Sequence, residues 1–356
     1  MSDLETFISQ MISSSGISAY EEPIRVIINS KWLSLADEIS ISRLGSLHAL
    51  CKGSGSLPRR KILLAAHMDA VGLMVTGVVD EFLRFTSVGA IDPRILPGQP
   101  VFVYGREELP GIIIKPPDHH LPSKYLEKTI PIEYLFIDVG LTPEETAKLV
   151  RSGDVIAFAN TPCRLFGETI SGHTLDDRAG VAAVTHCMEL LKSRVHLWDV
   201  WAVATTQEEA HYEGAYTSTY SIQPDIGISI DVCVAQGPGA EESVLSKLEG
   251  GVSIGILSDS HPYLYKALMV TAEKVGVPYV IDTFAVRPLH SATDAYAIQV
   301  TGKGIASVVV SIPLRYMHSP VELVSQKDIR FVGCLLAEFI ASLDDDFLEK
   351  INWDNL

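Results

Sequence analysis

The run Trp201-Ala-Val-Ala-Thr-Thr-Gln-Glu208-Glu209 is apolar and β-branched until it ends in two adjacent carboxylates. It is too short for a helix of its own and predicts a buried strand that delivers acidic residues to its carboxyl end. Three other apolar runs lead in the same way to histidine or acidic residues, at His67-Met-Asp69, at Asp231 and at His318. Open α/β sheets place their ligand sites at the carboxyl ends of their strands, so these residues define one candidate site.

The composition describes a globular protein that binds neither nucleic acid nor membrane. The chain has 356 residues, of which 47% are hydrophobic and 20% charged, and this length suffices for two domains. A net charge of −16 argues against nucleic-acid binding, which needs clustered Lys and Arg. No apolar run reaches the roughly 18 residues of a membrane helix, and the acidic N-terminus lacks a secretory signal. Five cysteines without a C-x-x-C spacing fit reduced thiols, so we expect a cytoplasmic protein.

The middle of the chain differs from its two ends in hydrophobic periodicity and in the spacing of Pro and Gly. Between Val71 and Phe166, short β-like runs alternate with closely spaced Pro and Gly, which is typical of a small all-β barrel or sandwich. We therefore predict a catalytic α/β domain in two parts, residues 1–69 and 168–356, with a barrel-like β domain inserted at 70–167. Because His67 and Asp176 flank this insertion and are assigned to one site, its two ends are expected to lie near each other.

Outside the insertion, helical and strand patterns alternate, which predicts a mostly parallel sheet with helices on both faces. Apolar residues at helical spacing predict helices at 4–11, 23–32, 178–193, 259–275, 294–300 and 326–343. Apolar and β-branched runs predict strands at 47–51, 61–66, 198–206, 279–284 and 305–312, and one that ends at Asp231.

Each candidate site residue has a purely structural alternative when it is taken singly. Two acids after a strand also suit the first turn of a solvated helix, and Asp176-Asp177 also suits a helix cap. His67 and His318 would then be ordinary core or loop histidines, and Asp231 a cap at a strand end. These alternatives would all have to hold at once, and they would not explain why the candidate residues converge on the ends of one sheet.

The charges of the candidates point to bound cations. Asp176, Glu209 and Asp231 are three carboxylates, and Glu208 would add a fourth at a partly buried site, where they would repel one another. Two divalent cations offset that repulsion. Two histidines and three carboxylates, one of them bridging, suit a pair of Zn²⁺ or Co²⁺ ions, with Mn²⁺ as a further candidate, roughly 3.5–4 Å apart.

These motifs resemble the glutamyl aminopeptidase/endoglucanase-like family of dinuclear metallopeptidases, which includes the tetrahedral (TET) aminopeptidases. The resemblance spans nearly the whole chain, in the family's order, through the segments Ala65–Gly72, Thr174–Gly180, Thr206–Glu209, Asp231–Val232, Thr293–Ala295 and Ile312–Glu322. It implies an aminopeptidase that releases N-terminal residues from peptides with a free N-terminus, through a hydroxide bridged between two metals. It also implies that the inserted domain serves assembly, in dimers that build a hollow dodecamer.

Carried over by motif, the resemblance implies that Asp176 bridges the metals. His67 and Asp231 would complete one metal site, and Glu209 and His318 the other. Glu208 would be the general base, and Asp69 would orient His67. The peptide bond between Asp176 and Asp177 is expected to be cis, as it often is in the family.

Two positions depart from the family pattern, with His211 in place of Gly and Glu213 in place of Arg. Either they are neutral changes at the rim, or they alter the specificity pocket by contacting substrate. Two other functions stay open beside the aminopeptidase. One is a different amide hydrolase, a deacylase or amidohydrolase, on the same metals, and the other is a catalytically silent assembly protein.

Overall fold

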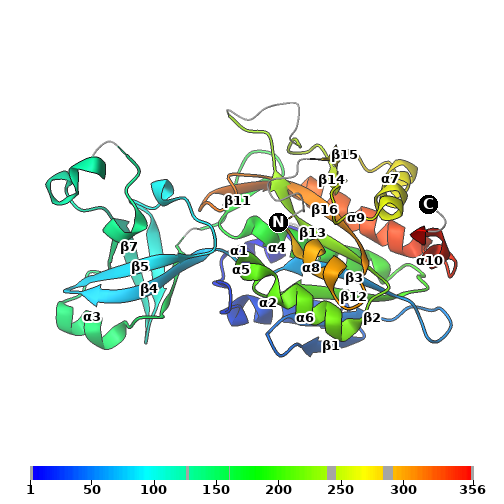
Figure 1. Ribbon diagram of the computed structural model, residues 1–356, viewed down its shortest axis with the longest axis horizontal. Coiled ribbons are helices and arrows are strands. Elements are labelled where there is room, and N and C mark those ends of the chain that lie inside the picture. The colour runs from blue at the N-terminus through cyan, green and yellow to red at the C-terminus, as the bar shows by residue number, and fades with distance from the viewer. Residues whose placement is uncertain (1–2, 126–127, 160, 239–245, 284–291, 354–356) are drawn as a thin grey trace.

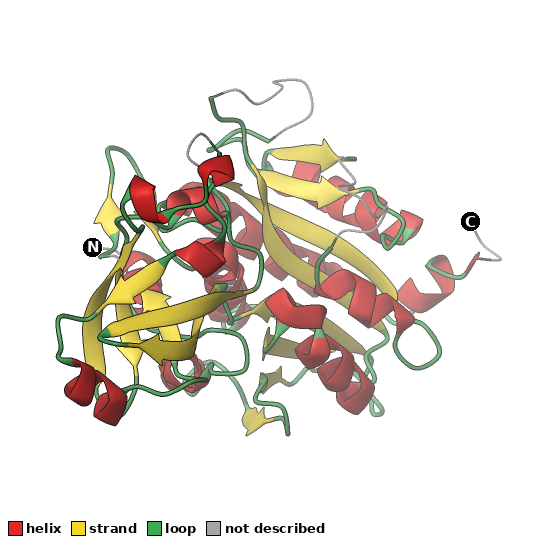
Figure 2. Ribbon diagram, turned by 60° about the vertical axis from the view of Figure 1, so that its left-hand side comes forward, coloured by secondary structure: helices red, strands yellow, loops and turns green. Residues whose placement is uncertain are grey.

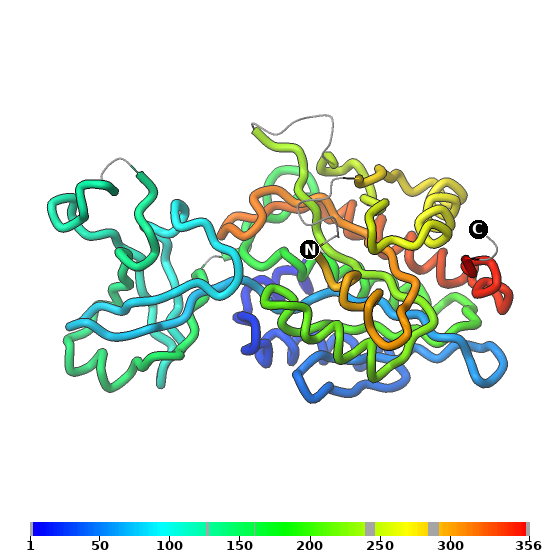
Figure 3. Tube along the Cα trace, viewed as in Figure 1, coloured from blue at the N-terminus to red at the C-terminus, as the bar shows by residue number. Residues whose placement is uncertain are grey.

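The computed structural model describes residues 3–125, 128–159, 161–238, 246–283 and 292–353. These residues form an 11-stranded sheet covered by helices and a separate closed barrel, which stands to the left in Figure 1. The Cα trace in Figure 3 shows that the barrel is one continuous stretch of chain, coloured cyan to green, between two parts of the larger body.

The centre of the sheet consists of four parallel strands, in the order β12 (Asp199–Thr205), β3 (Lys61–His67), β13 (Ile226–Val234) and β16 (Ala306–Arg315). The flanking strands are mostly antiparallel: β1 (Glu38–Ile41) and β2 (Leu47–Cys51) on one side, and β17 (Glu322–Ser325), β11 (Thr169–Gly172) and β10 (Cys163–Arg164) on the other. A parallel pair, β14 (Val252–Gly255) and β15 (Tyr279–Asp282), joins β16 in antiparallel orientation. The predicted fold class is confirmed, with its parallel character concentrated in the four strands that bear the candidate site.

Alternation along the central strands explains why both faces carry helices (Figures 1 and 2). In β3, Ile62 and Leu64 belong to the main core, whereas Leu63 and Ala65 belong to a smaller core on the other face. The main core is covered by α1 (Asp3–Ile12), α2 (Glu22–Trp32), α4 (Leu175–Leu191), α7 (Pro262–Val275) and α9 (Gln326–Ser342). The other face carries α6 (Glu213–Ile222) and α8 (Asp294–Val300), with the single turn α5 (Glu208–His211) leading into α6.

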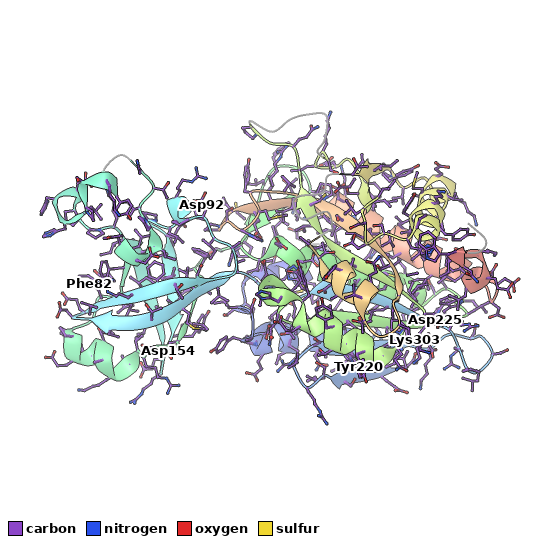
Figure 4. All side chains as sticks on the ribbon, in the orientation of Figure 1. Phe82, Asp92, Asp154, Tyr220, Asp225 and Lys303 are labelled. Carbon is purple, nitrogen blue, oxygen red and sulfur yellow. The ribbon has the colours of Figure 1, made fainter. Side chains whose placement is uncertain are left out.

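The barrel closes in the order β4 (Gly72–Val79), β5 (Phe82–Val88), β8 (Phe136–Asp138), β7 (Glu108–Ile114), β6 (Pro100–Tyr104) and β9 (Val155–Phe158). Alternate residues fill its apolar interior, among them Leu73, Val103 and Ile137. Figure 4 places Phe82, Asp92 and Asp154 on this part of the molecule and Tyr220, Asp225 and Lys303 on the other. All six strands fall between residues 70 and 167, while the domain boundaries themselves stay a prediction.

The barrel segment also contains a helix that the sequence analysis did not predict, α3 (Pro143–Leu149). Thr142 caps it by accepting a hydrogen bond from the amide of Glu145, whose carboxylate accepts one from the amide of Thr142 in return. The described part of the segment also contains four short 3₁₀ turns: η1 (Pro93–Ile95), η2 (Asp118–His120), η3 (Ser123–Tyr125) and η4 (Ile132–Tyr134).

The other predicted elements agree with the structure to within a few residues. The strand expected to end at Asp231 runs on to Val234, and the helix expected at 259–275 begins only at Pro262. The extended segment expected at 279–284 is β15 as far as Asp282, and Phe284 lies outside the described residues. A last short helix, α10 (Phe347–Lys350), ends the described chain. None of the described helices has the length and apolar character needed to cross a membrane.

Candidate metal centre

The structure brings the five candidate metal ligands and Glu208 to one place at the end of the parallel strands. His67 is the last residue of β3, Asp231 lies near the end of β13, and His318 follows β16. Glu208 and Glu209 begin α5 directly after β12, and Asp176 lies at the start of α4. Adjacent parallel strands that end together present their terminal side chains to one point, as the sequence analysis expected.

Asp176 lies at the middle of this group. Its Oδ1 is 3.1 Å from His67 Nε2, and its Oδ2 is 3.3 Å from His318 Nε2. Around His67 Nε2, Glu208 Oε2 lies at 3.8 Å and Asp231 Oδ1 at 4.0 Å. On the other side, Glu209 Oε1 is 3.3 Å from His318 Nε2. The two adjacent glutamates therefore face different histidines.

The ring of His67 is held from behind. Its Nδ1 lies 3.0 Å from the backbone carbonyl oxygen of Asp69 and donates to it, which directs Nε2 toward the carboxylates. The carboxylate of Asp69 is farther from the ring, with Oδ1 at 3.6 Å from Nδ1.

The carboxylate of Asp69 mainly fixes the backbone of the two glutamates. Its oxygens accept hydrogen bonds from the amides of Glu208 at 3.0 Å and Glu209 at 3.2 Å. The hydroxyl of Ser18 donates a third bond to it at 2.6 Å. Asp69 therefore links the position of His67 to that of Glu208 and Glu209.

A second buried acid, Glu322, holds the opposite side of the centre. Its two carboxylate oxygens accept hydrogen bonds from the backbone amides of Asp176, at 3.1 Å, and His318, at 2.9 Å. The peptide bond between Asp176 and Asp177 is cis, as expected from the resemblance. His318 has a φ of 58°, and Gln207, just before Glu208, has the same value. A left-handed backbone conformation is costly for residues other than glycine. Here it occurs at His318 and directly before Glu208, where it orients these two side chains.

The electrostatics of the centre are those of a site built for positive charge. Burial raises the pKa of Glu208, Asp231 and Asp177 well above the ordinary carboxyl value, and neighbouring carboxylates raise it further. Burial works against a charged His67, yet Glu208 and Asp176 outweigh it and raise its pKa well above the usual range. Burial also works against a charged His318, but the carboxylates of Asp176 and Glu209 outweigh burial and raise the pKa of His318 to about 11. Cations in place of these protons would meet the same demand for positive charge.

The unpaired oxygens support that fit. Among the described residues, the buried Asp177 Oδ2 has no hydrogen-bond partner, and Glu209 Oε1 has none apart from its 3.3 Å contact with His318 Nε2. Two overlapping groups could each hold a metal ion: His67, Asp177 and Asp231, and His67, Asp176 and Glu209. Imidazole and carboxylate donors without Cys suit a catalytic Zn²⁺, Co²⁺ or Mn²⁺ site with an open position.

The centre opens into a cleft of about 710 Å³. Of the two departures from the family pattern, His211 lines this cleft, whereas Glu213 does not and instead accepts a hydrogen bond from the His211 amide at 3.1 Å. Tyr212, between them, also faces the cleft.

Sequence reasoning missed several residues of the centre. Asp177 was treated only as the neighbour of Asp176, and Glu322 only as the end of a matching segment. Asp294 is buried and accepts a hydrogen bond from the hydroxyl of Thr205 at 2.5 Å, and Ser18 holds Asp69. For Asp177 and Glu322 the signal was an acid within a segment that already carried a candidate ligand, and for Asp294 it was an acid within a matching segment.

Comparisons with known proteins identify the family of this chain. Residues 45–335 match the model of the family described as M42 glutamyl aminopeptidase. The lysyl aminopeptidase of Pyrococcus furiosus is 32% identical, over 90% of this chain and 92% of that protein. Among solved structures, a TET aminopeptidase from a marine sediment Thaumarchaeota archaeon is 28% identical, with a TM-score of 0.92 over 98% of this chain and 99% of that one. The TET1 peptidase of Pyrococcus horikoshii is 30% identical, with a TM-score of 0.83 over 96% of this chain and 100% of that one. The chain therefore belongs to the M42 glutamyl aminopeptidase family of metal-dependent peptidases.

Proposed function

We propose that this protein is a metal-dependent aminopeptidase that uses a pair of divalent cations and Glu208 to hydrolyse the first peptide bond of peptides with a free N-terminus. One observation carries the proposal: two histidines and two carboxylates from four separate segments surround Asp176, and Glu208 faces the same centre. Membership of an aminopeptidase family supports the reaction class.

The proposed ligand set divides around Asp176, whose two oxygens face different histidines. His67 and Asp231 would hold one cation with Asp176, and Glu209 and His318 the other. Zn²⁺ or Co²⁺ suits these donors, with Mn²⁺ as a further candidate. When bound, such a pair supplies Lewis acidity, which lowers the pKa of water and polarises the scissile carbonyl.

Glu208 is the proposed general base. It is buried, it adjoins a proposed ligand, and burial raises its pKa. A carboxylate of raised pKa takes a proton from the attacking water more readily than an exposed one. It would then pass that proton to the nitrogen of the leaving amine. Asp69 would keep Glu208 in place through the backbone bond at 3.0 Å.

The restriction to N-terminal residues follows from the chemistry of the free α-amine. Such an amine would bind to a metal or a carboxylate at the inner end of the cleft, whereas an acylated amine has neither a positive charge nor a basic lone pair. A panel of aminoacyl anilides with N-acetylated controls tests this directly. Cleavage of the free-amine substrates alone is the expected result, and cleavage of the blocked ones would favour a deacylase or amidohydrolase instead.

The barrel is the proposed assembly element, joining subunits into dimers that build a dodecamer. The TET1 peptidase of P. horikoshii, one of the structural neighbours, can assemble into a tetrahedron or a large octahedral shell. A cytoplasmic location stays a prediction. The preferred N-terminal residue is also open, since the names of the family and of a relative point to residues of opposite charge, glutamyl and lysyl.

A further inference from the structure

Tyr212 brings a phenol to the part of the cleft that adjoins the candidate metal centre. It lines the cleft together with His67, Glu208 and Asp231. Burial raises the pKa of Tyr212, and the carboxylates of Glu208, Asp231 and Asp294 raise it further. Because charges act strongly only over short distances, the phenol must lie near these carboxylates, and it keeps its proton at neutral pH.

The backbone holds Tyr212 in this place. Its amide donates to the carbonyl oxygens of Gln207, at 3.1 Å, and Glu208, at 3.4 Å, and its φ of 65° is left-handed. Two residues further on, Gly214 lies so close to Thr206 that an added Cβ would be 2.3 Å from the Thr206 backbone oxygen. The turn between α5 and α6 is therefore packed onto the end of β12, and backbone strain of this kind is typical of functional sites.

The ring of Tyr212 is packed, but its hydroxyl is unpaired. The ring meets that of Tyr296 on α8 edge to face, with centroids 6.5 Å apart. The hydroxyl makes no hydrogen bond within the part of the chain that the structure describes. Tyr212 is half-buried and lines the cleft, so this donor is available to a bound substrate.

Hydrolysis of a peptide bond needs such a donor. When water attacks the scissile carbonyl carbon and Glu208 takes its proton, the electron pair of the C=O bond moves to the carbonyl oxygen. When the C–N bond breaks, that pair returns and Glu208 gives the proton to the leaving nitrogen. Between these steps the oxygen is negative, and the ionised carboxylates of Asp176 and Asp231 only accept hydrogen bonds.

Resting on the proposed aminopeptidase function, we propose that Tyr212 is a further catalytic residue, whose hydroxyl donates a hydrogen bond to the scissile carbonyl oxygen as that oxygen becomes negative. The phenol donates this bond without transferring its proton. It shares the stabilisation of the oxygen with the bound cations, and its fixed position means that little reorganisation is needed during the reaction.

The test is the variant Tyr212→Phe, which removes the hydroxyl and keeps the ring against Tyr296. In the metal-loaded protein, kcat should fall by about 10-fold to 100-fold on alanyl and leucyl p-nitroanilides alike, with KM nearly unchanged. Metal content should stay near two ions per chain. A dipeptide phosphinate, whose tetrahedral phosphorus resembles the intermediate, should bind more weakly by the same factor as kcat/KM falls.

Tyr216→Phe is the matched control. It removes the hydroxyl of another half-buried tyrosine, which lies on α6 outside the cleft, and should leave kcat and phosphinate binding unchanged. Wild-type kcat in Tyr212→Phe would overturn the catalytic role, and so would a loss confined to one of the two N-terminal side chains. A wild-type protein inactive on every free-amine anilide would instead overturn the proposed function, and this inference with it.

Discussion

The barrel and the sheet bury polar groups in very different ways. Among the described residues of the barrel segment, the buried polar or charged side chains are Thr146 and Asp154, and Asp154 accepts a hydrogen bond from the amide of Arg151 at 2.9 Å. The end of the sheet buries acids and histidines from many segments within contact of one another. Both regions have an apolar core of their own.

The difference separates a part built for stability from a part built for chemistry. Buried charge is costly unless it is paired, and evolution retains it where it serves a function. The barrel avoids that cost almost entirely, as expected of a part whose proposed role is to form surfaces. The sheet accepts the cost at one point, where bound cations would offset it.

Removing the shared carboxylate should give the largest effect. In Asp176→Ala both proposed metal sites lose a ligand, and His67 and His318 lose the carboxylate that links them. We expect the purified variant to hold no stoichiometric metal and to have no measurable activity. Metal content by mass spectrometry checks this prediction, and a variant that still binds two ions would refute the bridging role.

Removing the proposed base should abolish turnover while leaving the metals bound. Glu208→Gln keeps the size and burial of the side chain but cannot accept the proton, so kcat should fall by about 10²–10⁴-fold. Metal content should stay near two ions per chain. Substantial residual activity in a metal-replete Glu208→Gln protein would show that another group is the base.

Loosening the support behind the centre should have an intermediate effect. Asp69→Asn weakens the hydrogen bonds from the amides of Glu208 and Glu209, because an NH₂ group, which donates, replaces one of the two accepting carboxylate oxygens. Activity or metal affinity should fall by about 10-fold to 100-fold. The matched variant Asp154→Asn alters a buried aspartate of the barrel instead, and a similar loss of activity there would contradict the separation of the two regions.

A change in the barrel core should affect stability and spare the chemistry. Ile137→Ala removes a fully buried side chain from β8 and should lower the free energy of unfolding by about 2–5 kcal/mol. Below the unfolding temperature, kcat/KM on an aminoacyl anilide should change little. Ile112→Ala, at a half-exposed position on the neighbouring β7, is the control and should cost far less stability. Thermal unfolding with parallel assays measures both.

The sequence predicted the parts of this molecule that follow from local patterns. The apolar runs before His67, Glu208 and Asp231 predicted the parallel strands, and the position of each polar residue at a strand end predicted their convergence. The helix α3 was missed because its capping residues, Thr142 and Glu145, lie in a segment whose short β-like runs predict an all-β domain. The pair β14 and β15 was predicted only in part, since each strand is four residues long and gains its stability from pairing.

The supporting residues of the centre could not be predicted in their roles. Glu322 is the clearest case, because its two hydrogen bonds join the backbone of segments about 140 residues apart in the chain. Asp69 was expected to orient His67, and the structure adds its bonds to the glutamate backbone. Such contacts depend on three-dimensional packing, which no pattern along the chain encodes.

A crystal structure of the Co²⁺-loaded protein, with anomalous difference maps collected at the cobalt edge, tests the central claim most directly. The account predicts two peaks on opposite sides of Asp176, one within bonding distance of His67 and Asp231 and the other within bonding distance of Glu209 and His318. A single peak, or peaks that do not involve these residues, would contradict it.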